Sequence, residues 1–184
     1  MYSLLIKKGT IIDGTGKPGF VGDVAVEGDK IVAVAPHIST SGKEEIDAQG
    51  LVIAPGFIDV QNHSDSYWQL FDNPDLGSLT TQGFTTILVG NCGGSLAPLL
   101  SPDALLSLQK WHPLSGSNIN WTSYKEYATH MSKTTYGCNV ASLVGYSTLR
   151  RGLVGDGIRS LDSKETEALK ETLRQSLEAG AFGL

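Results

Sequence analysis

His63 and Cys92 are the two side chains of this sequence whose type and position best suit metal chemistry. Each follows a short apolar run, 56–60 in the case of His63 and 85–89 in the case of Cys92. Because the carboxyl ends of parallel strands meet at one edge of a sheet, where α/β proteins place their active sites, we expect the two side chains to face a common mouth. An imidazole and a thiolate form a suitable pair of zinc ligands. The spacing therefore predicts a zinc site that uses both residues.

Each of these residues also has an alternative interpretation. A single histidine at a strand end is about as often a hydrogen-bonded structural residue as a ligand, and a single cysteine is usually buried as a small apolar group. Cys92 is alternatively a nucleophile assisted by a histidine, which requires an exposed and deprotonated thiol. The matching positions of His63 and Cys92 after consecutive strands favour a shared metal site over these alternatives.

Two regions with different patterns must position these residues. Residues 1–54 consist of short β-prone runs separated by turns, which indicates a small sheet unit. Residues 55–184 alternate apolar strands, polar loops and helices, as expected of parallel α/β architecture. In this second region we expect strands at 56–60, 85–89, 139–144 and from Ala181, and helices at 75–82, 123–131 and 162–179.

The helix expected at 123–131 has both a start signal and an apolar face. Ser123 and Glu126 have the spacing of a capping box, in which each side chain bonds to the backbone of the other residue. Tyr124 and Tyr127 lie on one face of the helix together with other apolar side chains. We interpret these tyrosines as core residues and not as a platform on which nucleic-acid bases stack.

Composition excludes several classes of function. The 184 residues include 14 Lys and Arg against 19 Asp and Glu, a formal net charge of −5, which argues against binding of a nucleic-acid backbone. No apolar run approaches the roughly 20 residues that span a bilayer, and the start of the sequence does not have the pattern of a signal peptide. The two cysteines form no CxxC pair, which fits a reducing compartment. We therefore expect a cytoplasmic globular protein with no nucleic-acid or membrane partner.

Four blocks of the sequence, in order along the chain, resemble a known family. The blocks 54–65, 89–94, 143–150 and 178–184 are similar to those of the N-acyl-D-amino-acid deacylase, or D-aminoacylase, group of the amidohydrolase superfamily. The segments 9–15 and 46–50 also resemble the opening of the small β-domain of that group.

The resemblance implies a fold for both regions. Residues 55–184 would form about the first four strands of an incomplete TIM-type (β/α)8 barrel, an α/β fold that needs eight strands and about 250 residues when complete. Residues 1–54 would form the N-terminal part of a small β-sandwich domain that precedes it.

The resemblance also assigns metal ligands. In that family the first barrel strand ends in a His-x-His metal motif, and a cysteine after the second strand binds zinc. His63 matches the second histidine and Cys92 matches the cysteine. Gln61 stands where the first histidine is expected, and its neutral amide is a poorer zinc ligand than an imidazole. The implied cofactor is one or two Zn²⁺ ions, held by His63 and Cys92, with Gln61 as a weaker third candidate.

Three further residues have expected roles near this centre. Asp65 is expected to orient the His63 ring, as carboxylates commonly do for metal-bound imidazoles, or alternatively to cap the loop as an Asx turn. Arg150 matches the arginine of its block and could bind a substrate carboxylate through its planar fork; the alternative is an ordinary surface or ion-pairing arginine. Tyr146 stands where members of the group often carry histidine, and is a second candidate for substrate binding.

The implied function is a metal-dependent hydrolase that cleaves the non-peptide C–N bond of a small-molecule N-acyl amino acid, with the amino acid in the D configuration. The general-base aspartate of the family is expected beyond Leu184, so we expect this chain alone to be incomplete and inactive. The alternative is a non-catalytic half-barrel remnant or interaction protein. In either case a missing barrel half or a second copy of the chain would cover the open strand edge.

Overall fold

The computed structural model describes residues 1–107 and 119–184. The chain divides into two compact units, Met1–Pro55 and Gly56–Leu184. The boundary that the sequence predicts, between residues 54 and 55, lies one residue earlier. Among the described helices, none combines the length and the apolar character needed to cross a bilayer.

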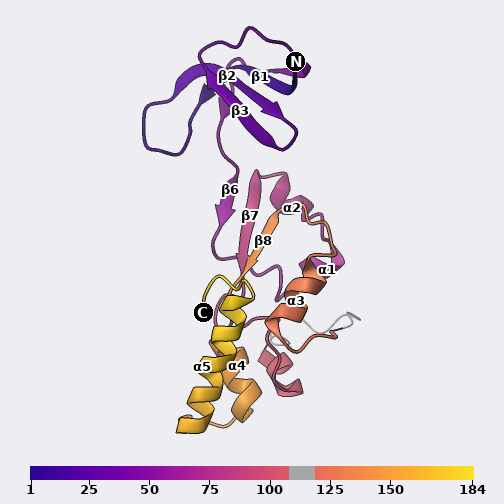
Figure 1. The fold of residues 1–184 in the computed structure, drawn as a ribbon, viewed down its shortest axis with the longest axis vertical. Coiled ribbons are helices and arrows are strands. Elements are labelled where there is room, and N and C mark those ends of the chain that lie inside the picture. Colours follow the sequence, from indigo (N-terminus) through magenta and orange to yellow (C-terminus); the bar gives the residue numbers. More distant parts are fainter. Residues whose placement is uncertain (108–118) are drawn as a thin grey trace. The chain divides into compact units, whose positions relative to one another are not determined.

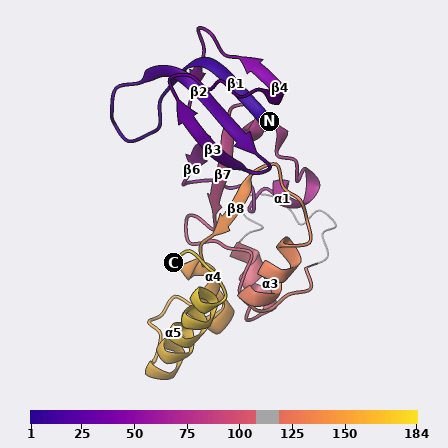
Figure 2. The same ribbon diagram turned by 45° about the horizontal axis from the view of Figure 1, so that its top comes forward.

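The first unit is a five-stranded sheet. Its four-strand path runs β3-β2-β1-β4, and a short fifth strand also pairs with β1. The β1/β2 and β2/β3 pairs are antiparallel, whereas β4 and β5 run parallel to β1, as Figure 2 shows for β1 to β4. The strands are β1 (Tyr2–Ile11), β2 (Phe20–Glu27), β3 (Lys30–Ala35), β4 (Gly42–Asp47) and β5 (Val52–Ile53).

The first unit packs around a small core and a buried carboxylate. Leu5, Ala25 and Ile38 form the core on one side of the sheet. The Asp23 carboxylate accepts hydrogen bonds from the backbone N–H groups of Lys8 and Ile38, at 2.9 and 2.8 Å. The described residues of this unit form one sheet, so the second layer of the expected β-sandwich is not among them.

The second unit contains a three-stranded parallel sheet in the sequential order β6-β7-β8 (Figure 1). The strands are β6 (Phe57–Asp59), β7 (Phe84–Val89) and β8 (Asn139–Ser142). Helical segments follow each strand, as the alternating pattern predicts for an α/β fold. Because the three strands are parallel, the loops that follow them lie at the same edge of the sheet.

The helices expected at 123–131 and 162–179 are present as α3 and α5, whereas the one expected at 75–82 is shorter. The helical segments of this unit are α1 (Gln69–Asp72), α2 (Gly77–Thr80), the 3-10 helix η1 (Pro102–Ser107), α3 (Tyr124–Met131), α4 (Tyr146–Val154) and α5 (Ser163–Glu178). The helix predicted over 75–82 is present but shorter, because Leu76 adopts a left-handed conformation with φ 46° and α2 begins only after it. Capping boxes start α3 at Ser123 and α5 at Asp162, and the box predicted for α3 is confirmed.

The core of the second unit is rich in aromatic side chains. Trp68, Trp121, Tyr124 and Tyr127 are all buried in one cluster, and Phe71 packs against it. The rings of Phe71 and Trp121 stack with centroids 6.0 Å apart. The prediction that Tyr124 and Tyr127 are core residues is confirmed.

The fourth strand expected from Ala181 does not form. The Phe182 N–H donates to the Ser142 carbonyl at 2.9 Å, and the Val144 N–H donates to the Gly183 carbonyl at 2.8 Å. In a regular parallel pair one residue of the partner strand makes both bonds, and the bonds are evenly spaced. Here Phe182 donates and Gly183 accepts, so the pairing beside the end of β8 is out of step by one residue and no ladder begins.

Candidate metal centre

The structure brings His63 and Cys92 together at the carboxyl ends of β6 and β7. The Sγ atom of Cys92 lies 3.9 Å from Nε2 of His63. Zinc bonds of about 2.0–2.1 Å to nitrogen and about 2.3 Å to sulfur put two such ligands roughly 3.6 Å apart in a tetrahedral site. The observed distance is therefore short enough for one ion to join the two atoms, and Cys92 is exposed. The donor types and their separation fit zinc.

An unusual backbone conformation presents the Cys92 side chain. Cys92 has φ 57°, in the left-handed region that non-glycine residues rarely adopt, and such residues are enriched at functional sites. Gly90 and Gly93 flank it with φ 82° and 75°. A Cβ atom on Gly90 would lie 2.5 Å from the Leu143 carbonyl oxygen, so the end of β8 leaves room only for glycine there.

Asp65 is buried between the two ligand-bearing loops. One carboxylate oxygen accepts a hydrogen bond from the Ser66 N–H at 2.8 Å, and the other accepts one from the Gly90 N–H at 2.9 Å. Burial raises the pKa of this carboxyl group, against the opposing effect of the hydrogen bonds from Ser66 and Gly90. In the described structure its hydrogen bonds come from Gly90 and from Ser66, whose hydroxyl also donates to Oδ1 at 3.4 Å, and none joins it to the His63 ring. A role in orienting that ring stays a prediction.

Two asparagines strengthen the same connection. The Asn62 N–H donates to the Leu88 carbonyl at 3.0 Å. The Asn91 side-chain amide donates to the carbonyls of Asn62 and Leu88, at 3.2 and 2.8 Å. Sequence reasoning missed both residues. The available signal for Asn91 was an asparagine directly beside a candidate ligand, because asparagine commonly bonds to backbone groups, whereas Asn62 takes part through its backbone alone.

Gln61 does not complete a metal site in the described structure. It is exposed, and its backbone N–H donates to Oδ1 of Asp59 at 3.0 Å. Within residues 1–107 and 119–184 there is no group of three or more His, Cys, Asp or Glu side chains that could hold an ion. His63 and Cys92 thus form a two-ligand pair, and metal binding by Gln61 stays a prediction.

The start of α4 packs against the Cys92 loop. The Thr148 N–H donates to the Gly93 carbonyl at 3.2 Å, and the Gly145 N–H donates to Oγ of Ser95 at 2.8 Å. A Cβ atom on Gly145 would lie 2.3 Å from the Gly93 oxygen, which shows how closely the two segments approach. Tyr146, 46% exposed, therefore begins its helix beside the loop that carries Cys92.

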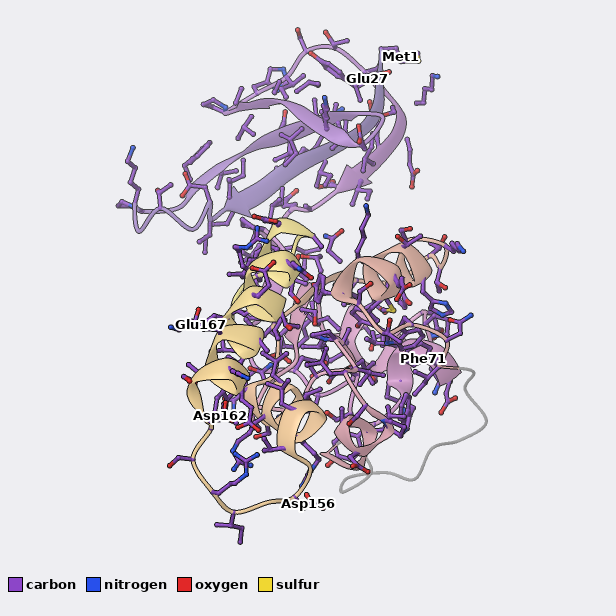
Figure 3. All side chains as sticks on the ribbon, turned by 60° about the horizontal axis from the view of Figure 1, so that its bottom comes forward. Met1, Glu27, Phe71, Asp156, Asp162 and Glu167 are labelled. Carbon is purple, nitrogen blue, oxygen red and sulfur yellow. The ribbon has the colours of Figure 1, made fainter. Side chains whose placement is uncertain are left out.

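The side chain of Arg150, on the same helix, forms hydrogen bonds to nearby backbone carbonyls. Its guanidinium donates to the Gly157 carbonyl at 2.7 Å and to the Arg159 carbonyl. Both acceptors lie in the loop between α4 and α5, where Figure 3 labels Asp156 and Asp162. A role for Arg150 in binding a substrate carboxylate stays a prediction.

The other histidines lie in different surroundings. The His130 ring packs against Trp121 with centroids 4.9 Å apart, and Nδ1 of His37 lies 3.5 Å from the Asp23 carboxylate in the first unit. His112 lies outside the described residues.

Sequence comparison relates the chain to D-amino-acid deacylases. No family model matches the chain. It is 35% identical over 185 residues to D-aminoacylase of Alcaligenes xylosoxydans xylosoxydans, which covers 100% of the chain and 37% of that enzyme. It is 37% identical over 180 residues to the N-acyl-D-aspartate deacylase of the same organism, covering 98% of the chain and 35% of the relative.

Solved structures give the same relationship. A D-aminoacylase structure, described for its binuclear metal center, superposes with a TM-score of 0.89 and 34% identity, covering 100% of this chain and 38% of that one. The N-acyl-D-glutamate deacylase of Bordetella bronchiseptica, complexed with zinc and a phosphonate inhibitor, superposes with a TM-score of 0.85 and 35% identity, covering 99% and 37%.

The chain spans little more than a third of the length of these relatives. The matches confirm the resemblance that the sequence blocks indicate. The chain belongs, as a counterpart of the N-terminal portion of its members, to the D-aminoacylase group of the amidohydrolase superfamily.

Proposed function

We propose that this chain supplies His63 and Cys92 as two ligands of the metal centre of an N-acyl-D-amino-acid deacylase. The observation that carries the proposal is the 3.9 Å separation of Sγ and Nε2 at the ends of adjacent parallel strands. In this proposal β6, β7 and β8 are the first three strands of a (β/α)8 barrel, whose active sites lie at the carboxyl ends of the strands.

The chemistry of the two donors suits this activity. When bound at such a site, zinc lowers the pKa of a coordinated water toward about 7 and polarises a carbonyl group. The chain's own residues hold the ion and orient its ligands. His63 and Cys92 bind the ion, while the hydrogen bond from the Asn91 side chain to the Asn62 carbonyl keeps the two loops together. The remaining ligands and the general base belong, in this proposal, to residues outside the described part of the chain.

The substrate class follows from the relatives. Those most similar in sequence include deacylases of N-acyl-D-aspartate and N-acyl-D-glutamate, so we propose an N-acyl-D-amino acid as the substrate. Cleavage of its amide C–N bond by water gives a carboxylate and a free amine. Tyr146, exposed at the start of the helix that packs on the Cys92 loop, is the substrate-binding candidate that this geometry supports best.

Metal content tests the proposal directly. Chains carrying His63→Ala or Cys92→Ala are purified beside wild type and analysed for zinc by mass spectrometry. We expect bound zinc in wild type and a loss of most of it in both variants, because each removes one of two donors. The matched controls are His37→Ala, whose ring is exposed in the first unit, and Cys138→Ala, the other free cysteine. Equal zinc in all five proteins, or none in wild type, contradicts the proposal.

A second candidate function rests on the exposed edge of the parallel sheet. Phe57 and Ile58 of strand β6, and Val60 directly after it, are between 60% and 65% exposed, and such apolar edge strands pair readily with other chains. The chain would then be a non-catalytic half-barrel that associates with a second copy or with a partner chain. Light scattering combined with zinc analysis separates the two functions, because metal-free oligomers favour the interaction protein.

A further inference from the structure

We infer that Asp65 is a positioning residue that fixes the Cys92 loop to the His63 loop, so that Sγ and Nε2 face each other before an ion binds. This inference rests on the proposed metal site. It differs from the common arrangement in which a carboxylate bonds to the ligand imidazole itself. Here the carboxylate acts on the backbone of the neighbouring loop.

The contacts of Asp65 join two distant parts of the sequence. Its side chain is 1% exposed, and its two oxygens bond to different segments: one to Ser66 in its own loop and one to Gly90, 25 positions away. Gly90 comes two residues before Cys92, and Asp65 comes two residues after His63. The Asp65 to Gly90 bond therefore closes a short bridge between the two proposed ligands.

Gly90 contacts both the Asp65 carboxylate and the Leu143 backbone, and its position determines where the Cys92 side chain lies. With φ 82° it turns the chain at the end of β7, and its α-carbon lies against the Leu143 backbone. The hydrogen bond to Asp65 fixes the direction of its N–H group. The turn closed by the hydrogen bond from the Gly94 N–H to the Asn91 carbonyl follows directly and contains the left-handed Cys92, so a movement of Gly90 would displace the thiol.

The two donors explain why this buried side chain is a carboxylate. Burying a charged group is costly unless hydrogen bonds compensate it. An aspartate offers an acceptor oxygen to each N–H group, whereas an asparagine offers one oxygen and an NH₂ group. In Asp65→Asn one of the two backbone donors would face another donor, and either the Ser66 or the Gly90 bond would be lost.

Asp59, the last residue of β6, provides a matched control directly before the same loop. Its carboxylate also accepts two hydrogen bonds, from the Gln61 N–H at 3.0 Å and from the Asn62 side-chain amide at 2.8 Å. Both donors belong to the β6 loop itself, so Asp59 does not connect this loop to Cys92. Asp59→Asn is the same chemical change without loss of the bridge.

Cobalt binding by the full chain reads out the position of the thiolate. Co²⁺ is titrated into wild type, Asp65→Asn, Asp59→Asn and Cys92→Ala, and the thiolate-to-cobalt charge-transfer band is followed. We expect Asp65→Asn to weaken Co²⁺ binding roughly 10- to 100-fold, the usual effect of removing a residue that supports a ligand. The band returns at saturating Co²⁺ because Cys92 is still present. Cys92→Ala loses the band at every concentration, and Asp59→Asn stays close to wild type.

The outcomes separate this inference from the proposed function. A wild-type chain without the band contradicts the metal site and, with it, the role of Asp65 toward that site. A wild-type band with unchanged affinity in Asp65→Asn overturns the inference about Asp65 alone.

Hydrogen exchange of the Gly90 amide gives a second measurement, and its wild-type part needs no variant. We expect this amide to be protected in wild type and in Asp59→Asn, and to exchange faster in Asp65→Asn. If Asp65→Asn does not fold, the wild-type measurement decides: protection supports the bridge, and exchange as fast as in an unstructured peptide overturns it.

Discussion

Cys92 Sγ and His63 Nε2 lie 3.9 Å apart although 29 positions separate them in the sequence. Two features produce this approach: adjacent parallel strands end at the same edge of the sheet, and the loops after β6 and β7 are joined by hydrogen bonds through Asp65 and Asn91. The two side chains are thus brought together by tertiary structure. The conformational strain of the loop that presents Cys92 should be measurable as a loss of stability.

Replacement of Cys92 tests whether its backbone is strained. The left-handed conformation costs about 1–2 kcal/mol for a residue with a Cβ atom and little for glycine. We therefore expect Cys92→Gly to be about 1 kcal/mol more stable toward urea than Cys92→Ala, although both variants lack the thiol. Equal free energies of unfolding for the two variants would show that the turn carries no such strain.

Gly90 tests the close contact between the ends of β7 and β8. Gly90→Ala places a Cβ atom 2.5 Å from the Leu143 oxygen in addition to the positive φ, so we expect it to lower the free energy of unfolding by more than 2 kcal/mol, roughly the upper end of the left-handed cost alone. Gly180→Ala is the control in the same unit, because Gly180 has φ 103° and open space around it. Similar losses in the two variants would argue against a decisive contact at Gly90.

The sequence predicts the parts of this arrangement that depend on local pattern. The capping box of Ser123 and Glu126 and the burial of Tyr124 and Tyr127 both follow from helical spacing, and both are present. The placement of His63 and Cys92 at one edge follows from strand order, because parallel strands share their carboxyl edge.

The rest depends on contacts between segments that are far apart in the sequence. Nothing near Asp65 in the chain indicates that its partner is the Gly90 amide. No local sequence pattern marks the left-handed Leu76 that shortens the expected helix, or the one-residue offset in the pairing of Phe182 and Gly183 with the end of β8. The same holds for Arg150, whose acceptors are backbone carbonyls that no motif marks.

Arg150→Ala distinguishes the two interpretations of this arginine. Because the side chain bonds to the Gly157 and Arg159 carbonyls, we expect the variant to lose about 0.5–1.5 kcal/mol per hydrogen bond at most and to exchange amide hydrogens faster in the loop between α4 and α5. Zinc content should stay at the wild-type level. Lys125→Ala, on the exposed surface of α3, is the control for loss of a positive charge. Unchanged hydrogen exchange in the loop would instead indicate that the guanidinium does not stabilise the loop and is available to bind a substrate carboxylate.

The capping box of α3 predicts a loss of stability in acid. Hydrogen bonds from the backbone N–H groups of Ser123 and Thr122, and from their hydroxyls, lower the pKa of Glu126 from 4.5 to about 2. A carboxyl group whose pKa is lower in the folded state stabilises the fold fully above its unfolded pKa, and this contribution is lost as the pH falls through the folded pKa. We therefore expect part of the stability of the second unit to disappear between about pH 4.5 and pH 2.

Glu126→Gln isolates this contribution, because a glutamine at the same position keeps an acceptor oxygen but does not titrate. We expect the variant to be less stable than wild type at pH 7, to show a smaller loss on acidification, and to match wild type near pH 2, as followed by urea unfolding at each pH. Glu167→Gln is the control, since that carboxylate bonds to Lys170 on the exposed surface of α5 and caps no helix. A Glu126→Gln curve parallel to that of wild type across this pH range would mean that the capping carboxylate is not what couples α3 to pH, and that other groups of the second unit cause its acid sensitivity.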